Sequence, residues 1–366
     1  MSKLEQLILE LCPDGVEDVV LGEIAKISNG RDHKALPDGA YPVYGSGGIM
    51  RYANQCIYDT PSVLIPRKGS LGNIFFVDEP FWTVDTIFYT VINEDRIMPK
   101  YFYYFIVAQH IEDLNQAGGV PSMTKAVLDK IRIPLPPLPI QREIVCILDN
   151  FTELTAELTA ELTARKKQYE HYSKTMFTFS DNETFLVRWK QLSEVADIGT
   201  GSSNTIDGLE EGKYPFFVRS QEVRYKNEYE FDETAIITSG DGVGVGKIFH
   251  YVEGRYALHQ RAYRIHINDV QLNPKYFYYY MKTTFYEYIT QNAFHSSVTS
   301  IRRPMLNKYP VPLLPLAEQE RIVAILDKFD ALTVDISSGL PAEIEARNKQ
   351  YEYYRDKLLT FKEVDA

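Results

Sequence analysis

An internal repeat constrains the fold of this 366-residue chain more than any other feature. Short segments recur in the same order at an offset of about 171 to 182 residues, which excludes coincidence. The repeat predicts two copies of one unit, each consisting of a globular domain followed by a long helix. The matched segments are 21–30 with 192–201, 41–42 with 214–215, 72–75 with 246–249, 99–104 with 274–279, 147–151 with 325–329, and 167–172 with 349–354.

Length and composition are those of an ordinary globular protein of two or three domains. Hydrophobic residues make up 45% of the sequence and charged residues 24%, so bulk disorder is not expected. The N-terminus lacks the pattern of a signal peptide, and the densest apolar run, 101–108, is too short to cross a bilayer. Cys12, Cys56 and Cys146 form no C-x-x-C pair, which predicts free, buried thiols in a reducing cytoplasm.

The net charge of −11 would by itself argue against a nucleic-acid partner. Its distribution weakens that objection. The acidic excess lies in residues 1–20 and in two helical stretches, whereas the two globular parts are close to neutral. The globular parts can therefore carry local basic patches, although the composition does not demonstrate them.

Each globular part has the sequence pattern of a mixed α/β domain. Short apolar runs bounded by Gly, Pro and Asp predict strands, and a Pro-Lys pair opens each predicted helix. Aromatic residues line both helices, and packing of these rings on the sheet is favoured over base stacking. The predicted strands are 63–65, 74–77, 87–92, 235–238, 248–251 and 262–267, and the predicted helices are 101–114 and 276–290.

A proline-rich segment closes each globular part. The first reads Ile-Pro-Leu-Pro-Pro-Leu-Pro at 133–139, and the second reads Val-Pro-Leu-Leu-Pro-Leu at 311–316. Proline fixes φ and lacks the backbone N–H, which predicts stiff, extended connectors and not helix. A ligand for a proline-binding domain is the alternative, but the same placement in both copies favours the connector.

Each connector leads into a heptad pattern typical of coiled coils. We expect the two helices to pair as an antiparallel coiled coil, with the globular domains related by a pseudo-twofold axis. The second helix has one additional seam residue, Ile344, beside Gly339 and Pro341, which predicts a stutter and a kink or break. The residues predicted to pair the helices are Ile144, Leu148, Phe151, Leu158, Leu162, Tyr169, Tyr172, Ile322, Leu326, Phe329, Ile336, Leu340, Tyr351 and Tyr354.

The first helix contains the tetrad Glu-Leu-Thr-Ala three times in succession, over residues 153–164. Four helical residues advance about 6 Å and rotate about 40° beyond one full turn. This rotation is close to the twist of one DNA base pair. We interpret the tetrads as a ruler for the spacing of the two domains; the alternative is a slippage product on a solvated helix.

Motifs for catalysis and metal binding are nearly absent. Asn273-Pro-Lys-Tyr resembles the Asn-Pro-Pro-Tyr motif of adenine methyltransferases, but Met98 replaces the asparagine in the other copy, and a helix start explains both. The glycine-rich segment 240–246 lacks P-loop spacing and precedes a predicted strand, which favours a hairpin. The seven histidines form no i, i+4 pair and no Cys/His set has zinc spacing, so no metal site is predicted.

The repeat, the connectors and the heptad helices together resemble the specificity subunit of type I restriction–modification enzymes. The resemblance covers nearly the whole chain and is most specific at the connectors with Gln141 and Gln319 and at the tetrads. It implies two target recognition domains that read the halves of a bipartite, asymmetric DNA target, with spacer helices between them. It also implies docking of two methyltransferase subunits, which carry S-adenosylmethionine, and of restriction and translocase subunits. By this resemblance the chain is non-catalytic and binds no cofactor and no membrane.

The resemblance divides the chain into five segments. They are an N-terminal helical segment packing near the C-terminal helix (1–20), target recognition domain 1 (21–138), a central spacer helix (139–187), target recognition domain 2 (188–314) and a C-terminal spacer helix (315–366).

Contacts to bases and phosphates require hydrogen-bond donors and cations in loops. Such residues lie beside Gly, Pro or Ser turn signals, several at equivalent places in the two copies. Because the copies differ most in these loops, we expect the two half-sites to differ. The candidate DNA-binding residues are Asn29, Arg31, Lys34, Tyr44, Ser46, Arg67, Lys68, Ser70, Ser122, Lys125, Ser202, Asn204, Arg219, Gln221, Gln260, Arg261, Ser297, Thr299, Arg302 and Arg303.

Two other classes of function are open on the sequence. A stand-alone N6-adenine DNA methyltransferase would bind its cofactor without a partner subunit. A coiled-coil scaffold would bind only protein. A DNA-recognition subunit is favoured over both, because it accounts for the repeat, the tetrads and the missing cofactor loop together.

Overall fold

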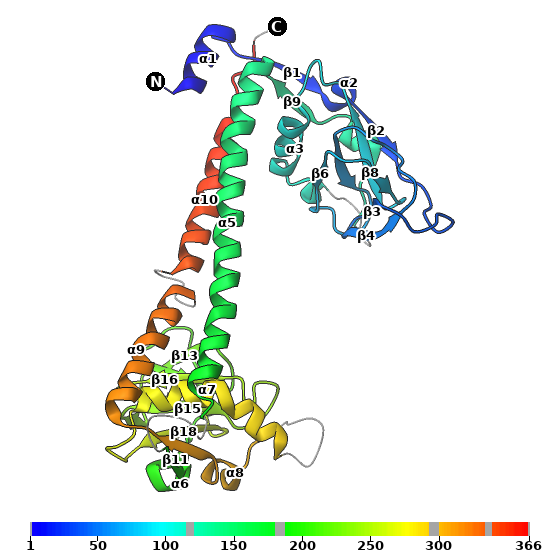
Figure 1. Cartoon of the computed structure of the whole chain (residues 1–366). Helices are drawn as coiled ribbons and strands as arrows, with labels where there is room; N and C mark the ends of the chain where they lie inside the picture. Colours follow the sequence, from blue (N-terminus) through cyan, green and yellow to red (C-terminus); the bar gives the residue numbers. More distant parts are fainter. Residues whose placement is uncertain (1, 115–120, 180–186, 293–299, 334–338, 365–366) are drawn as a thin grey trace. The chain divides into compact units, whose positions relative to one another are not determined.

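A computed structural model describes the chain except for residues 1, 115–120, 180–186, 293–299, 334–338 and 365–366 (Figure 1). The chain forms two compact units. Unit 1 combines Met1–Thr159 with Ile344–Ala366, and unit 2 comprises Ala160–Glu343. The long helix α5, Leu138–Met176, begins in unit 1 and ends in unit 2.

The globular part of unit 1 has the predicted mixed α/β fold. It contains a four-stranded sheet in the order β2-β8-β5-β6, a three-stranded sheet in the order β4-β3-β7, and the pair β1-β9. Its elements are α1 Lys3–Leu11, β1 Glu17–Val20, α2 Leu21–Ile24, β2 Ala25–Asn29, β3 Tyr41–Gly45, β4 Gly48–Ala53, β5 Ser62–Pro66, β6 Phe75–Val77, β7 Trp82–Thr83, β8 Ile87–Ile92, α3 Pro99–Ala108, a 3-10 turn Ile111–Leu114, α4 Lys125–Leu128 and β9 Arg132–Leu135.

The globular part of unit 2 repeats this topology, which confirms the internal repeat. Its main sheet has the order β11-β18-β15-β16, its second sheet the order β13-β12-β17-β14, and β10 pairs with β19. Its elements are β10 Arg188–Gln191, α6 Leu192–Val195, β11 Ala196–Thr200, a 3-10 turn Thr205–Asp207, β12 Tyr214–Phe217, β13 Val223–Lys226, β14 Phe231–Asp232, β15 Ala235–Ser239, β16 Phe249–Val252, β17 Arg255–Leu258, β18 Ala262–Ile267, α7 Pro274–Gln291, α8 Arg303–Asn307 and β19 Pro310–Leu313.

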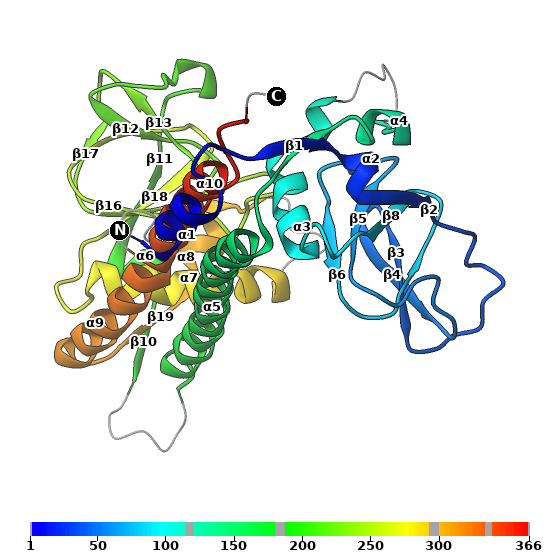
Figure 2. The same cartoon turned by 90° about the horizontal axis from the view of Figure 1, so that it is seen from above.

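The aromatic helices α3 and α7 form the centre of each core. Tyr101 and Phe102 of α3 and Tyr276 and Phe277 of α7 are each fully buried, and Figure 2 shows α3 between the sheet and α5 in unit 1. The prediction that these rings pack in the core is confirmed. The prediction of one helix over 101–114 is wrong, because the chain leaves the helical conformation at His110, whose φ is 45°.

The proline-rich segments are extended only in their first half. Ile133 and Pro134 lie in β9, which pairs with β1, and the corresponding β19 pairs with β10. Pro139, however, lies in the first turn of α5, where a missing N–H costs nothing. The prediction of a connector without helix is therefore wrong for residues 138–139 and for Leu316, the first residue of α9.

A buried glutamine ties each proline segment to the helix-start loop of its globular part. The side-chain Oε1 of Gln141 accepts a hydrogen bond from the Met98 N–H at 2.8 Å, and its Nε2 donates to the Arg96 and Pro136 carbonyls at 3.0 and 2.8 Å. The Gln141 side chain is fully excluded from solvent. Its amide oxygen and nitrogen therefore supply the hydrogen bonds that these three backbone groups cannot obtain from water.

The second copy repeats this arrangement at Gln319. Its Oε1 accepts from the Asn273 N–H at 2.8 Å, and its Nε2 donates to the Gln271 and Leu314 carbonyls, both at 2.8 Å. Gln319 is also fully buried. The two glutamines in the most specific part of the resemblance thus have a structural role in both units.

A carboxylate on each long helix holds the aromatic helix beside it. In unit 1, Asp149 accepts hydrogen bonds from Lys100 at 2.7 Å and from the Tyr104 hydroxyl at 2.6 Å. In unit 2, Asp327 accepts from Lys275 at 2.8 Å and from the Tyr279 hydroxyl at 2.6 Å. Both globular parts are therefore fixed to their helix by the same three polar side chains.

Helices α9, Leu316–Thr333, and α10, Leu340–Leu358, pack antiparallel to α5 within their own units. In unit 1 the rings of Phe151 and Tyr354 stack with centroids 5.6 Å apart. In unit 2 the equivalent pair, Phe329 and Tyr172, lies 5.9 Å apart, and Tyr169 also contacts Phe329 at 6.0 Å. The same contact thus closes the helix pair in both units.

The remaining predicted pairing residues fall into three groups. Ile144, Leu148, Ile322 and Leu326 are buried in cores that they share with the globular parts, and Tyr351 packs against the core of unit 1. Leu158, Leu162 and Leu340 are half-buried, and Ile336 lies outside the described residues. The heptad positions near the connectors therefore serve the domain core as well as the helix pair.

The predicted discontinuity in the second helix coincides with two separate helices. Helix α9 ends at Thr333, and α10 begins at Leu340, directly after Gly339. Pro341 then lies in the first turn of α10, where proline fits a helix without loss of a hydrogen bond. The glycine and proline thus mark a helix start.

Both ends of the described chain lie in unit 1. Val16 forms a parallel bridge with Glu363, and Arg132 of β9 pairs with the Glu363 carboxylate at 2.5 Å. The side chain of Lys3 pairs with Glu143 of α5. No helix within the described ranges has the length and apolar character needed to span a membrane.

Candidate DNA interface

The candidate loops of unit 1 converge on residues 83–86, from the last residue of β7 to the residue before β8, which we call hub 1. Backbone N–H groups of Arg31, Arg67 and Lys68 donate to carbonyl oxygens of hub 1 at 2.8, 2.9 and 3.2 Å. A hub N–H donates in turn to the Tyr44 carbonyl at 3.0 Å. The structure thus brings together three loops that are separate candidates in the sequence.

Two further loops join this cluster. Lys68 forms an antiparallel bridge with Ser122, and the Asn73 side-chain amide donates to the Ser46 carbonyl at 3.1 Å. The side chains of Asn29, Arg31, Lys34, Lys68 and Ser70 are exposed, and those of Tyr44, Ser46, Arg67, Ser122 and Lys125 are half-buried.

Two of the predicted cations are engaged within the domain. The Lys125 ammonium donates to the Ile27 carbonyl at 2.9 Å and lies 5.8 Å from the centre of the Phe88 ring. The Arg67 guanidinium lies 5.8 Å from the centre of the same ring. Lys125 therefore braces β2, while the more exposed Lys68 is the better placed cation for a ligand.

Glycine is required where the first loop of each copy meets its hub. A Cβ on Gly30 would lie 2.0 Å from the Val84 carbonyl oxygen, and a Cβ on Gly201 would lie 1.8 Å from that of Leu258. Neither distance is tolerable for a side chain. The glycines at the ends of the best-matched repeat segments, 21–30 and 192–201, are thus explained by close backbone approach.

Unit 2 has the equivalent cluster around residues 258–261, which we call hub 2. Hub 2 accepts hydrogen bonds from the N–H groups of Ser203 and Gly240 at 3.2 and 2.9 Å and donates to the Phe217 carbonyl at 2.9 Å. The Ile301 N–H donates to the Gly240 carbonyl at 2.8 Å, which adds the loop before α8. The bridge between Lys68 and Ser122 in unit 1 recurs between Asp241 and Ser300.

Opposite charges distinguish hub 2 from hub 1. Asp241 pairs with Arg219 at 2.6 Å and with Arg261, a hub residue, at 3.1 Å. Partial burial by itself would raise the pKa of Asp241, but the hydrogen bonds from the two arginines outweigh this effect and lower it. The carboxylate is therefore ionised at neutral pH, and the three side chains carry a net charge of about +1.

The other candidates of unit 2 are distributed around this cluster. Gln221 and Gln260 are exposed, and Arg302 and Arg303 are exposed at the start of α8. Ser202 and Asn204 are exposed in the loop after β11, and Asn204 caps the short 3-10 turn. Ser297 and Thr299 lie outside the described residues.

Sequence reasoning missed the acidic residues of this face. In the sequence Asp241 stands out only as part of a glycine-rich segment, and Glu230 does not stand out at all. Glu230 accepts hydrogen bonds from the Ser202 N–H at 2.8 Å and the Ser203 hydroxyl at 2.5 Å, and Lys226 donates to the same hydroxyl at 2.7 Å. No local pattern marks these residues, because their partners lie in other loops.

The features that suggested other chemistry have structural explanations. The side chain of Asn273 accepts from the N–H groups of Lys275 and Tyr276 and caps α7. The segment 240–246 forms turns that lead to β16 and not to a helix. The cysteines are free, but Cys56 is half-buried and Cys146 is exposed, so the prediction of buried thiols is confirmed only for Cys12.

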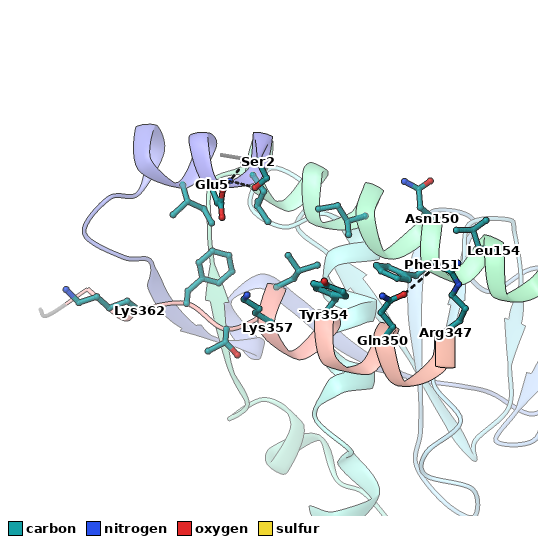
Figure 3. Close-up of a pocket in the computed structure, with 16 residues that line it drawn as sticks. Ser2, Glu5, Asn150, Phe151, Leu154, Arg347, Gln350, Tyr354, Lys357 and Lys362 are labelled. Carbon is teal, nitrogen blue, oxygen red and sulfur yellow. Dashed lines mark hydrogen bonds between the residues drawn. The ribbon is translucent and has the colours of Figure 1, made fainter. Parts of the chain in front are cut away.

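A second candidate surface in unit 1 is a pocket of about 830 Å³ where α1, α5 and α10 meet (Figure 3). Its apolar wall includes Phe151, Leu154 and Tyr354, and its rim carries Arg347 and Lys357. Leu154 is 45% exposed, although Phe151, one helical turn before it, stacks on Tyr354. The pocket therefore presents apolar surface beside positive charge, a combination typical of protein contact sites.

Comparison with known proteins identifies the class. The sequence matches the type I restriction modification DNA specificity domain twice, over residues 13–165 and 187–346. The chain thus belongs to the family of type I restriction–modification DNA specificity subunits, as the resemblance implied.

Individual relatives support this membership. The chain is 32% identical to the EcoR124I/EcoR124II specificity subunit of Escherichia coli, over 99% of this chain and 97% of the relative. It is 30% identical to a putative type I restriction enzyme specificity subunit of Haemophilus influenzae, over 94% and 96%. The fold resembles that of the specificity subunit from M. genitalium, with a TM-score of 0.66, 18% identity, and coverage of 94% of this chain and 96% of that one.

Proposed function

We propose that this chain reads a bipartite, asymmetric DNA target, with the globular part of each unit reading one half. One observation carries the proposal: the same loop frame occurs in both units with different side chains on it. Lys68 in unit 1 corresponds to Asp241 in unit 2 through the equivalent bridges to Ser122 and Ser300. A constant frame with variable side chains is what two readers of different sequences require.

The chemistry on the DNA is assigned to partner subunits. We propose two methyltransferase subunits, one for each unit, which bind S-adenosylmethionine, together with restriction and translocase subunits. The chain then contributes recognition and assembly and no catalytic group. Support comes from family membership and from the pocket of unit 1, whose apolar wall and basic rim suit a protein partner.

Mapping of methylated adenines across the host genome tests the proposal. We expect a bipartite motif in cells that express the chain with its methyltransferase subunit, and loss of that motif when the gene is deleted. An unchanged methylation pattern after deletion would contradict a role in DNA modification.

Two alternatives make different predictions. A stand-alone methyltransferase would bind S-adenosylmethionine as the purified chain; the capping role of Asn273 argues against it, because the residue proposed to bind the flipped base is already engaged. A pure scaffold would give no gel shift of duplex DNA when bound to the methyltransferase subunit.

Arg302 and Arg303 provide a test of phosphate contact. Both side chains are exposed beside hub 2. Replacing both by alanine should weaken DNA binding by the methyltransferase complex and reduce its log–log salt slope by about 2, because each phosphate contact contributes roughly 0.9. The control is Arg255→Ala, at the far end of β17 from hub 2. An unchanged slope for the double variant excludes these two residues as phosphate contacts.

The pocket of unit 1 provides a test of subunit docking. Leu154→Glu places a charge on its apolar wall, and since the side chain is 45% exposed the fold should tolerate the change. We expect the affinity for the methyltransferase subunit to fall more than about tenfold in a pull-down titration. Tyr353→Glu is the matched control, because Tyr353 is 62% exposed and does not line the pocket. Equal retention of the partner by both variants would rule out this docking site.

A further inference from the structure

The three charged side chains at hub 2 are arranged differently from a simple phosphate site. Arg219 and Arg261 lie in different loops, 42 residues apart in sequence, and both bind the one carboxylate of Asp241. Each arginine uses a single Nη1 group for this contact. A cluster built only to attract phosphate would not contain a carboxylate between its cations, since the acid removes about half of the attraction.

The carboxylate instead fixes the direction of the arginines. An exposed arginine normally samples many rotamers, and ordering it on binding costs free energy. Arg261 is 64% exposed but is held at one end by Asp241, which is only 25% exposed. Among the described residues, the structure records no hydrogen bond from the Nε or Nη2 of Arg261, so these donors are available to a ligand.

From this geometry we infer that Arg261, held by Asp241, which Arg219 also binds, reads a guanine in the half-site that unit 2 contacts. Guanine presents two acceptors, O6 and N7, on one edge in the major groove, and a planar guanidinium matches them with two parallel N–H donors. Cytosine, adenine and thymine present no such pair of adjacent acceptors. This inference rests on the proposed function, because it takes hub 2 to face DNA.

At hub 1 the two equivalent positions carry other residues. Lys68 occupies the position equivalent to Asp241. Thr86 occupies the hub position equivalent to Arg261. The Thr86 carbonyl accepts hydrogen bonds from the Arg67 and Lys68 N–H groups, just as the Arg261 carbonyl accepts one from the Gly240 N–H. Among the described residues, the arginine held by the carboxylate at the bridge position therefore occurs at hub 2, and the equivalent positions at hub 1 carry a threonine and a lysine. The guanine requirement should accordingly belong to one half-site only.

The test is methylation mapping in host cells that carry the full set of subunits with Arg261→Ala, Arg261→Gln or Asp241→Asn. We expect one guanine of the target motif to become degenerate, with discrimination falling about ten- to one-hundred-fold, while the other half-site and the spacer stay unchanged. Arg261→Gln replaces the paired donors by one donor and one acceptor, so it should relax the guanine or shift the preference toward adenine. Arg255→Ala is the matched control. Arg255 forms a comparable exposed pair with Asp232, with 2.9 Å between Nε and Oδ2, and this pair does not belong to hub 2.

The outcomes separate this inference from the proposed function. A bipartite motif that keeps every base in Arg261→Gln and Asp241→Asn overturns the guanine assignment and leaves the proposed function intact. If Arg261→Ala abolishes methylation, the glutamine variant decides: a relaxed or altered guanine position supports the inference, and the wild-type motif overturns it. Absence of any bipartite motif with the wild-type chain contradicts the proposed function itself.

Discussion

Replacing Gln141 by leucine should destabilise the globular part of unit 1 by about 3 kcal/mol or more. The substitution removes the partner of one N–H, at Met98, and of two carbonyl groups, and each buried polar group left without a partner costs about 1–3 kcal/mol. Because the side chain is fully buried, water cannot restore these hydrogen bonds without opening the core. The loss is larger than for an exposed substitution, which typically changes stability by less than about 0.5 kcal/mol.

Amide hydrogen exchange of the purified full chain measures this effect unit by unit. For Gln141→Leu we expect exchange of β9, α3 and the first turns of α5 to accelerate about a hundredfold, with unit 2 unchanged. Gln319→Leu is the matched variant and should produce the reverse result, acceleration in β19, α7 and α9 only. If amide exchange accelerated equally in both units, or in neither, each glutamine would not stabilise its own unit independently of the other.

Deleting one tetrad, residues 157–160, should shorten the spacer of the bipartite target by about one base pair and leave both half-sites unchanged. The deletion removes about 6 Å of α5 and rotates the C-terminal part of that helix by about 40°, close to the twist of one base pair. The structure makes this change tolerable, because none of the residues 153–164 is buried. The boundary between units 1 and 2 also falls inside the tetrads, so no core loses a residue.

Methylation mapping again provides the measurement. Insertion of a fourth tetrad should lengthen the spacer by about one base pair, the opposite shift. Glu157→Gln keeps the length of the helix and should leave the spacer unchanged. The ruler interpretation fails if the deletion and insertion variants both methylate the wild-type motif.

Elements with a clear period were predictable from the sequence, and their ends were not. The strands at 87–92 and 262–267 and the long helix were predictable because apolar spacing repeats over many residues. The end of α3 was misplaced because it depends on the positive φ of His110, which composition does not reveal. The first half of each proline segment was predicted to be extended, but its pairing was not, since the sequence does not show that β1 and β10 lie alongside.

The candidate interface was predictable only in part. Loop residues such as Arg31 and Lys68 were selected correctly as exposed, because turn residues and charge mark them locally. Their assembly around hub 1 depends on strand pairing between distant segments and left no local signal. The same applies to Asp241, whose significance comes from two arginines that reach it from other loops.

The division of the chain has a consequence for synthesis on the ribosome. Unit 2 is continuous in sequence, Ala160–Glu343, whereas unit 1 needs Ile344–Ala366 to complete it. The second unit can therefore reach its final packing before the first, although it is made later. A premature stop at Ile344 would remove Tyr354, the stacking partner of Phe151, and would therefore destabilise unit 1, most of which is encoded at the opposite end of the gene.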